Sequence, residues 1–576
     1  MPLRNLYIVP GNLLLLMHLL YRQIIIFLLS FFVLPAGQAQ FPQWNRLSLF
    51  GGNAYDNVSA VRTDLYGNYY IAGQIQDVFG PGATDFTGNC QSLHPLREDD
   101  VDGFVFRYDS SYTLTLKFAV PGRVYSMATD SKGNIIVAGI TEYDYSFDGG
   151  ITVVPNSGAG DGYVAKYSPN GTLLWYRVVK SGDVDVVTSV DVDKDDNILV
   201  AGFSNGQQSF IFDRTVNSTA NHFINYVILC HSDGSINWIN LVPDDVRVQK
   251  AVFDNNRDIV FTGSRMPDSS VAIKAAVGKI NGSNGAIVWS KVWGEDGNMY
   301  IQEGKAIAIA SNGDYIFGGE YSGTAKFDQM QLTVKGYIDI FLVRTDTVGN
   351  IRWLQTAGSN EFDKIYDIEY SNSQIYFCGG FSDNFYIGNN VLHARDYTDV
   401  FVAAADTTGK INWTMTGGSS STGHKGDFFY HEFAAQMAMD KNGRLQVGGT
   451  TIGSGAFGNL HFSASEKTNQ NGFWVTIAAI AGNSNTSYPC SAENILGSVE
   501  LYPNPFTDHI TARFTNLAVN AVTKWALYDA VGRLYKKSSF TGPLLEIDKL
   551  QALAPGLYII HIDGAAPASM RVIKNK

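Results

Sequence analysis

Hydrophobic and polar positions along the chain form short strand-like runs that return about every 60 residues between residues 41 and about 480. In each unit a polar turn precedes an apolar run that ends in glycine, as in GNIIVAG from Gly133 to Gly139. The closing glycines lie 56 to 69 residues apart, at Gly73, Gly139, Gly202, Gly263, Gly319, Gly380 and Gly449. A period of this length built from strand-like runs is typical of propellers and solenoids.

The second half of the unit carries the pattern Gly-x-x-x-Trp after another apolar run. Its copies are Gly171–Trp175, Gly234–Trp238, Gly285–Trp289, Gly349–Trp353 and Gly409–Trp413. Because glycine tolerates positive φ, each copy predicts a strand, a tight turn and a strand, with the tryptophan buried between neighbouring units. The two halves together give about four antiparallel strands per unit, which predicts a propeller blade.

The two end copies of the repeat are incomplete in complementary ways. The last unit has NGFWVTIAAI (Asn471 to Ile480) but no Gly-x-x-x-Trp strand after it. The segment QWNRLSLFGG (Gln43 to Gly52), with Trp44, is similar to the fourth strands that carry Trp353 and Trp413. We therefore expect the N-terminal strand to complete the last blade, which hides the edges of an open stack. The predicted fold is all-β: a closed seven-bladed β-propeller over residues 41–482, a linker over 483–497 and a small Ig-like β-sandwich over 498–576.

The repeat resembles a known bacterial family. The runs DSKGNIIVAG from Asp130, DGYVAKY from Asp161 and GTLLW from Gly171 are similar to β-propeller repeats of the SBBP type. The resemblance implies the propeller architecture and does not imply one activity.

The last 80 or so residues carry a different set of motifs, namely LYPNPF (501–506), WALYDAVGRLY (525–535), LAPGLYIIHI (553–562) and the basic end RVIKNK. These motifs resemble the type A C-terminal sorting domain of the Bacteroidetes type IX secretion system. The residues that carry the resemblance are Tyr502, Pro503, Asn504, Pro505, Gly532, Arg533, Gly556 and Tyr558. It implies that the type IX machinery is a partner, and that the cargo is released or attached to the outer-membrane surface after the domain is removed. The alternative is an Ig-like accessory domain that binds a ligand itself.

The N-terminus has the pattern of an export signal. Arg22 precedes the apolar run Ile24 to Leu34, and small residues follow at Gly37 and Ala39. Residues 1–40 are therefore predicted to be a signal peptide, with Met1 and Met17 both open as start codons. The alternative is an uncleaved anchor, but the run is short for a bilayer span, so we expect no transmembrane segment in the mature chain.

The charge of the chain bears on its possible partners, and its cysteines bear on its possible disulfides. Lys and Arg (42) fall short of Asp and Glu (54), and the net charge of −12 argues against a nucleic-acid partner. Cys230 and Cys378 lie inside strand runs and are predicted to be buried. A disulfide between Cys90 and Cys490 stays open.

Several short motifs suggest chemistry, and each has a structural alternative. Gly202-Phe-Ser204-Asn-Gly206 fits a nucleophile elbow, but no helix pattern follows it and Ser382 repeats it, so we interpret it as part of the repeat. Asp191, Asp193 and Asp195 have calcium-loop spacing without the glycine at the sixth position, which favours a hairpin turn over calcium.

Acidic and histidine residues also recur near predicted loops. Asp102, Asp161, Asp339, Asp399 and Asn471 each lie at the start of a third strand. This recurrence favours a structural role, with a cation or sugar site at the channel mouth as the alternative. The insertion from Gly417 to Phe433 contains His424, Asp427, His431 and Glu432, which suit a metal, although a polar, aromatic surface loop is favoured.

The sequence thus assigns no catalytic residue and no cofactor. The function that it favours is a surface-displayed binding or adhesion module, whose ligand is a glycan or an extracellular protein held by loops such as 141–155 and 417–433. The first alternative is a secreted polysaccharide hydrolase or lyase with its site at the channel mouth. The second is a structural surface protein without a discrete ligand.

Overall fold

The structure is a computed structural model of the 576-residue chain. It describes residues 42–51, 56–76, 86–88, 91–93, 101–147, 159–218, 223–242, 246–266, 273–295, 301–420, 432–462, 470–478, 499–502, 506–514, 522–529, 533–541, 544–563 and 568–575. These residues contain strands and no helix, so the predicted all-β class is confirmed. The chain forms two compact units: residues 1–86 with 93–487, and residues 87–92 with 488–576.

The described residues of the first unit form seven sheets built on four antiparallel strands each, and a separate two-stranded sheet of β24 (Thr324–Phe327) and β25 (Met330–Thr333). The strands of each sheet are given in the order in which they are hydrogen-bonded: sheet 1 has β2 (Asn57–Thr63), β3 (Tyr69–Gln76), β6 (Val101–Tyr108) and β7 (Leu114–Pro121), and sheet 2 has β8 (Arg123–Thr129), β9 (Ile135–Thr141), β10 (Asp161–Tyr167) and β11 (Leu173–Lys180). Sheet 3 has β12 (Asp185–Val192), β13 (Ile198–Ser204), β16 (Ile224–Cys230) and β17 (Ile236–Val242), and sheet 4 has β18 (Val246–Phe253), β19 (Ile259–Arg265), β20 (Lys274–Ile280) and β21 (Ile287–Trp293). Sheet 5 has β22 (Gln302–Ile309), β23 (Tyr315–Tyr321), β26 (Asp339–Thr345) and β27 (Ile351–Gly358), sheet 6 has β28 (Lys364–Ser371), β29 (Gln374–Phe381), β32 (Asp399–Asp406) and β33 (Ile411–Ser419), and sheet 7 has β34 (Phe433–Met439), β35 (Leu445–Ile452), β38 (Gln470–Ala478) and β1 (Gln43–Gly51).

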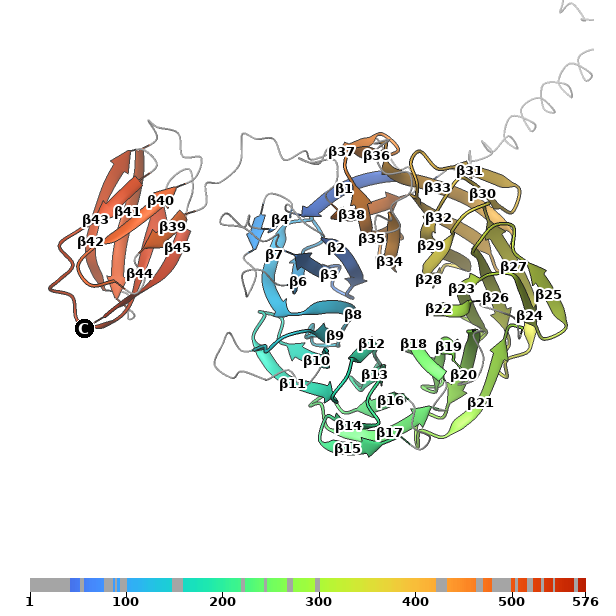
Figure 1. The fold of residues 1–576 in the computed structure, drawn as a ribbon. Coiled ribbons are helices and arrows are strands. Elements are labelled where there is room, and N and C mark those ends of the chain that lie inside the picture. Colours follow the sequence, from blue (N-terminus) through green and yellow to red (C-terminus); the bar gives the residue numbers. More distant parts are fainter. Residues whose placement is uncertain are drawn as a thin grey trace, which may run out of the picture. The chain divides into compact units, whose positions relative to one another are not determined.

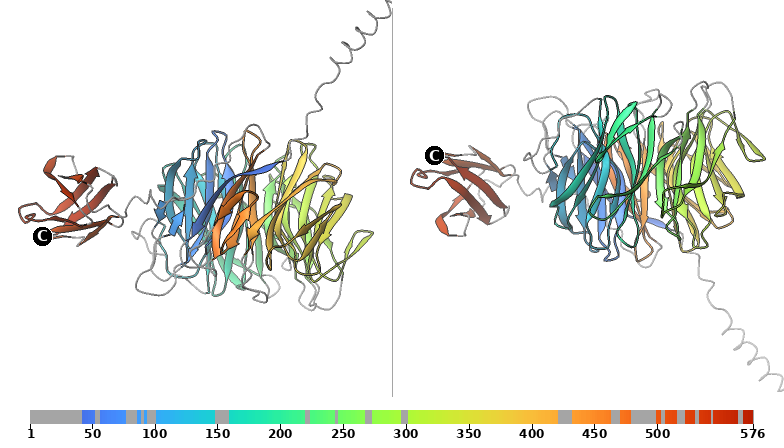
Figure 2. Two further views of the ribbon diagram at one scale, coloured as in Figure 1. Left: turned by 90° about the horizontal axis from the view of Figure 1, so that it is seen from above. Right: turned by 90° about the horizontal axis from the view of Figure 1, so that it is seen from below.

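The sheets are arranged around a common axis, with the first strand of each sheet innermost (Figure 1). Each first strand contacts the first strand of the next sheet, and β34 of sheet 7 contacts β2 of sheet 1. Seen from the side, the strands of the sheets run roughly along this axis (Figure 2). The turns between first and second strands and between third and fourth strands lie at one end, which we call the turn face. The opposite end, where each second strand leads to the third, is the loop face.

Sheet 7 is built from both ends of this unit. Strand β1 pairs antiparallel with β38, with Leu47 opposite Val475 and Leu49 opposite Phe473. Sheet 7 also meets sheet 1 directly, because Thr63 Oγ1 donates to the carbonyl oxygen of Met439 at 2.9 Å.

The Gly-x-x-x-Trp repeat has a packing reason. The glycine of one sheet lies against the tryptophan of the preceding sheet: a Cβ on Gly285 would stand 2.7 Å from the ring of Trp238. The same relation joins Gly234 to Trp175 and Gly349 to Trp289. These glycines also have positive φ, +73° at Gly285, so the turn and the close approach both favour glycine.

The predicted burial of the repeat tryptophans is met in part. Trp44 and Trp238 are buried, whereas Trp175, Trp289, Trp353 and Trp413 are partly exposed. The indole nitrogens still bridge the sheets, because Trp175 Nε1 donates to Ser232 O at 3.1 Å and Trp238 Nε1 to Gly282 O at 2.9 Å.

Short outer strands extend the four-stranded pattern that the sequence predicted. They are β4 (Phe86–Gly88), β5 (Gln91–Leu93), β14 (Gln208–Ile211), β15 (Arg214–Asn217), β24 (Thr324–Phe327), β25 (Met330–Thr333), β30 (Asn384–Ile387), β31 (Asn390–His393), β36 (Gly455–Phe457) and β37 (Leu460–Phe462). Hairpins β14–β15, β30–β31 and β36–β37 each leave one sheet and pair with the fourth strand of the sheet before it. These hairpins therefore link neighbouring sheets at their outer edges.

The second unit has two sheets. One has the order β39 (Val499–Tyr502), β40 (Ile510–Phe514) and β43 (Leu544–Ile547). The other has the order β42 (Leu534–Thr541), β41 (Val522–Asp529), β44 (Gly556–Asp563) and β45 (Ala568–Lys574). Their core includes Phe506, Trp525, Leu527, Tyr558 and Ile560. Among the described residues of the whole chain, no helix is suited to crossing a membrane.

Candidate functional site

The axis of the seven-sheet unit is lined by a repeated irregularity. In all seven sheets the first strand carries a register shift at the same place, where one extra residue is inserted. The inserted residues are Ser59, Tyr125, Thr188, Gln249, Lys305, Tyr366 and Ala435. We call them the bulge ring. A β-bulge redirects side chains and often lies next to a binding site.

The residues of the bulge ring are exposed to solvent, although they follow buried positions. Every bulge residue is partly or fully exposed, and the residue before it is buried in every sheet. Some bulge side chains also connect neighbouring first strands: Ser59 Oγ donates to Val124 O at 2.5 Å, and Thr188 Oγ1 donates to Val248 O at 2.9 Å. Each innermost strand therefore carries one inserted residue that stays accessible to solvent.

Polar groups gather on the innermost strands of sheets 4, 5 and 6. Gln249 Nε2 donates to Glu303 Oε1 at 2.7 Å, and Lys305 Nζ lies 2.7 Å from Glu303 Oε2. Arg247 and Lys364 occupy the positions in β18 and β28 that Glu303 occupies in β22, each two residues before the bulge residue. We call these five residues the polar arc, which lies toward the loop face.

Two members of the polar arc form no ion pair with any described residue, although Arg247 Nη2 donates to Asn205 Oδ1 at 3.5 Å. Within the described residues, neither Arg247 nor Lys364 forms an ion pair within 4 Å. The Arg247 guanidinium lies over the Phe203 ring, 4.0 Å from its centroid, which holds the side chain in place.

Aromatic side chains accompany the polar arc. Tyr125 of the bulge ring is 40% exposed. Tyr366 stacks on Phe433 of the next first strand, with ring centroids 4.5 Å apart and planes inclined by 25°. Flat aromatic faces beside fixed donors and acceptors suit a ligand that has both apolar faces and polar edges.

One pair of carboxyl groups lies at this end of the axis. Glu303 of β22 is directly opposite Glu320 of β23. Burial raises the pKa of Glu320, and the neighbouring Glu303 carboxylate raises it further, against the lowering effect of Lys305 and Lys364. Glu303 is held by Gln249 and Lys305, so the two carboxyl groups have different environments.

Charged residues also lie deeper in the first strands, toward the turn face. Lys250 and Asp367 form an ion pair between sheets 4 and 6. Arg62, Asp191 and Glu369 come from sheets 1, 3 and 6, and burial together with the Asp367 charge raises the pKa of Glu369 to about 7. With Lys250 of sheet 4, this group links four sheets electrostatically.

The recurrent acids of the third strands are buried at the junctions between sheets. Asp102, Asp161, Asp339 and Asp399 are 0 to 3% exposed, and Asn471 is 8% exposed. Three of them face a second buried acid of the following sheet, in the pairs Asp161 with Asp185, Asp339 with Asp363 and Asp399 with Glu432. We call these three pairs the junction carboxyls.

The junction carboxyls are held closely by backbone donors. Ser359 N donates to Asp363 Oδ2 at 2.5 Å, and Ser419 N donates to Glu432 Oε2 at 2.9 Å. A Cβ on Gly418 would lie 2.6 Å from Glu432 Oε2 and 2.9 Å from Asp399 Oδ1, which brings those two carboxyls together. Burial, and then repulsion by Asp399, raises the pKa of Glu432 to about 8 despite its hydrogen bonds.

The calcium-like spacing Asp191, Asp193 and Asp195 does not bring three carboxylates to one point. Asp191 Oδ2 accepts from Phe253 N at 3.0 Å in the next sheet. Asp193 Oδ1 accepts from Asn197 N at 2.8 Å within its own turn, and Asp195 pairs with Arg257. Among the described residues, no group of three His, Cys, Asp or Glu side chains is placed to hold a metal ion. His424, Asp427 and His431 lie outside the described residues.

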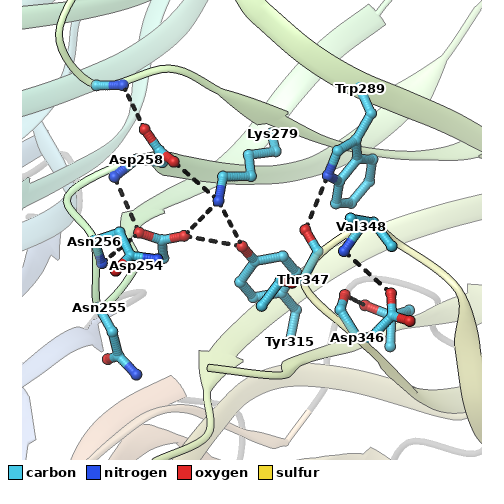
Figure 3. A network of polar contacts seen from close by, with 12 residues as sticks. Asp254, Asn255, Asn256, Asp258, Lys279, Trp289, Tyr315, Asp346, Thr347 and Val348 are labelled. Carbon is cyan, nitrogen blue, oxygen red and sulfur yellow. Dashed lines mark hydrogen bonds and ion pairs between the residues drawn. The ribbon is translucent and has the colours of Figure 1, made fainter. Parts of the chain in front are cut away.

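Figure 3 shows what the equivalent turn does in sheet 4. Lys279 Nζ lies 2.9 Å from both Asp254 and Asp258, and Tyr315 of sheet 5 donates to Asp254 Oδ2 at 2.9 Å. Asp254 Oδ1 also accepts from Asp258 N at 3.0 Å. The turn aspartates therefore order the hairpins and connect adjacent sheets.

The remaining sequence motifs are placed as follows. Ser204 is fully buried and contacts Ser209, and Ser382 N donates to Asp363 Oδ1 at 3.1 Å, so both serine positions belong to the junctions. Cys230 and Cys378 are free and buried. Cys90 and Cys490 lie outside the described residues.

The sorting-motif residues fall partly in the second unit's strands. Arg533 Nε pairs with Asp529 Oδ2 at 2.7 Å, and the Tyr558 hydroxyl donates to Ala554 O at 2.9 Å. Tyr502 ends β39 and Gly556 begins β44. The others, Pro503, Asn504, Pro505 and Gly532, lie outside the described residues.

Comparison with known families identifies this unit. Residues 500–575 match the family described as a secretion system C-terminal sorting domain. The match confirms the predicted sorting domain and implies export by type IX secretion, to the medium or to the cell surface.

Similarity over the repeat region is weaker. An uncharacterized WD repeat-containing protein L264 from Acanthamoeba polyphaga mimivirus is 30% identical over 105 residues, 16% of this chain, and this chain spans 8% of that protein's length. Among solved structures, the Neurospora crassa Pan2 WD40 domain has 7% identity and a TM-score of 0.36, with 78% of this chain and 99% of that chain covered. A Bacteroides caccae protein of unknown function has 11% identity and a TM-score of 0.29, with 54% and 89% covered. Scores at this level carry no functional conclusion.

Proposed function

We propose that the chain is an exported β-propeller binding module of the cell surface, which holds a glycan at the loop-face end of its axis. The blades are the seven sheets, closed by β1, and they belong to the SBBP type. The arrangement of β1 beside β38 and of β34 beside β2 supports this proposal.

The proposal includes the processing of the chain. Residues 1–40 are a signal peptide, residues 41–482 the propeller, 483–497 a linker and 498–576 an Ig-like sorting domain. The sorting-domain match to residues 500–575 supports the C-terminal boundary. The apolar run Ile24 to Leu34 before Gly37 and Ala39 supports the N-terminal one.

The observation that carries the binding function is the bulge ring. The seven inserted residues, one per innermost strand, include Tyr125, Gln249, Lys305 and Tyr366, which are partly or fully exposed although the position before each is buried. A saccharide ring offers apolar C–H faces to tyrosine and hydroxyl groups to amide and ammonium donors, so this set of side chains suits it. A protein ligand is the other outcome that the test must detect.

A glycan array probed with the purified secreted protein tests this function. We expect a restricted set of glycans to bind, and Y366A to lose most of that signal because its stacked ring is removed. The control is Y386A, on the exposed outer hairpin β30–β31, which should bind as the wild type does. Absence of glycan binding, with capture of a surface protein instead, would replace the glycan by a protein ligand.

A second function is favoured by one further observation. Glu303 and Glu320 lie opposite each other with different environments, which is the arrangement that a hydrolase or lyase uses for acid and base. Release of reducing sugar from a polysaccharide panel by the wild type, lost in E320Q, would establish this activity. Inert behaviour on every polysaccharide that binds would leave the binding module.

A further inference from the structure

The polar arc is positively charged, whereas the whole chain has a negative net charge. The whole chain has 42 basic and 54 acidic side chains, a net charge of −12. The polar arc contains three cations, Arg247, Lys305 and Lys364, against the single carboxylate of Glu303. A local cationic site on an acidic protein attracts anionic ligands over the background field.

The positions of these cations leave two of them for a ligand. Lys305 is neutralised by Glu303 at 2.7 Å. Arg247 and Lys364 stand on either side of Glu303, in the first strands before and after β22, and have no ion-pair partner within 4 Å among the described residues. They are partly exposed and toward the loop face.

Glu320 does not outweigh this charge, because three cations face only two carboxylates even when Glu320 is counted as ionised. Its side chain is 5% exposed, and Oε1 is buried without a hydrogen-bond partner. Burial raises the pKa of the Glu320 carboxyl, against the lowering effect of Lys305 and Lys364.

The cation at the equivalent position of β8 is already engaged. Arg123 of β8 pairs with Glu142 at 3.1 Å. Asn57 and Phe433 occupy the equivalent positions in β2 and β34 and carry no charge. Among these equivalent first-strand positions, all within the described residues, the unpaired positive charges therefore lie on β18 and β28.

Resting on the proposed function, we propose that the ligand is an acidic saccharide whose sugar carboxylate pairs with Lys364, with Arg247 as a second cation on the far side of Glu303, while a sugar face packs on Tyr366. Charge-assisted hydrogen bonds from ammonium and guanidinium groups are the strong form of carboxylate recognition. The stack of Tyr366 on Phe433 lies beside Lys364 in the same strand, which places an aromatic face within reach of the same sugar.

The test compares two forms of one ligand. Oligogalacturonate and its full methyl ester have the same backbone, but only the first carries carboxylates. We expect the purified secreted protein to bind the acid at least about tenfold more tightly than the ester, and to lose affinity as sodium chloride is raised from low to high concentration. Alginate and hyaluronan oligosaccharides extend the acidic set, and laminarin and xylan oligosaccharides provide neutral ones.

Single substitutions test whether Lys364 is responsible for the preference for the acidic ligand. K364Q should weaken binding of the acid about five- to tenfold and leave the ester unchanged. K326Q, on the exposed outer strand β24, is the matched control and should bind both ligands as the wild type does. The melting temperature of each variant checks that it is folded.

Each outcome decides the question. Equal affinity for acid and ester, preference for neutral glycans, or an unchanged ratio in K364Q overturns the acidic ligand and leaves the glycan module in place. Failure to bind any acidic or neutral glycan overturns both.

Discussion

The Tyr69 hydroxyl donates a hydrogen bond to Oδ2 of Asp440 at 3.0 Å, although 371 positions separate the two residues. The same contact joins Tyr315 to Asp254 between sheets 4 and 5, at 2.9 Å. In both places a cation completes the group, Arg444 beside Asp440 and Lys279 beside Asp254. The contact between the last and first sheets is therefore built like one between consecutive sheets.

This equivalence predicts the effect of removing the two hydroxyls. Y69F and Y315F should each lower the free energy of unfolding by about 1–2 kcal/mol, because each removes one buried hydrogen bond to a carboxylate. Chemical denaturation of both variants measures the two losses. A cost for Y315F without a cost for Y69F would mean that sheets 7 and 1 separate in solution.

The Gly-x-x-x-Trp repeat predicts that alanine costs more stability at one glycine than at another glycine with the same backbone conformation. Gly285 has φ +73° and would place a Cβ 2.7 Å from the Trp238 ring, whereas Gly443 has φ +74° and open space around it. G443A should cost about 1–2 kcal/mol for the left-handed conformation alone. G285A should cost about 1–3 kcal/mol more, because the added methyl group overlaps the indole.

Thermal melts of the two variants, made side by side, measure this difference. Equal losses would show that the backbone conformation alone selects glycine. The indole contact would then have no part in the repeat.

The strands and turns could be predicted because their signals are local. The apolar run GNIIVAG and the glycine of Gly171-x-x-x-Trp175 each define a turn and a strand within a few residues. The pairing of β1 with β38 could be anticipated from the two incomplete end copies. The outer hairpins were missed because strands of three or four residues give no clear alternation.

The candidate site could not be predicted in the same way. A bulge adds one residue and leaves the apolar run intact, so Lys305 and Tyr366 give no sign in the sequence that they are the inserted residues. The junction carboxyls meet only through packing between sheets. One signal was available: Asp185 follows Asp161, and Asp363 follows Asp339, by the same 24 positions, each four residues after a serine.

Burial of two cysteines predicts their chemical behaviour. Desolvation raises the pKa of Cys230 to about 12, and Cys378 is shifted in the same direction. Because the thiolate is the reactive form, neither residue should be alkylated by iodoacetamide at pH 8 in the folded protein. Peptide mass mapping should find both modified only after unfolding.

An exposed thiol provides the control for this experiment. S111C, in the exposed turn after β6, should react at once under the same conditions. Modification of Cys230 at a comparable rate in the folded protein would contradict its burial in sheet 3.

The junction carboxyls predict that stability falls as pH rises. The pKa values of Asp185 and Asp399 are raised to about 6, that of Asp363 to about 7 and that of Glu432 to about 8, in each case chiefly by burial. An unfolded carboxyl titrates near pH 4, so between about pH 4 and 8 the folded state binds more protons than the unfolded state. The stabilisation is complete below about pH 4 and is lost as pH passes through the folded-state values.

The E432Q variant tests the contribution of one pair. Its amide cannot ionise, so the decline in unfolding free energy should become shallower by up to about 1.4 kcal/mol per pH unit between about pH 5 and 8. D109N is the control, because hydrogen bonds from Ser111 lower the pKa of Asp109 and keep it charged throughout this range. Denaturant titrations from pH 5.5 to 8.5 measure the three slopes. If both E432Q and D109N retained the wild-type slope, Glu432 would already be ionised in the folded state, and its buried pair with Asp399 would have to be stabilised by another cation.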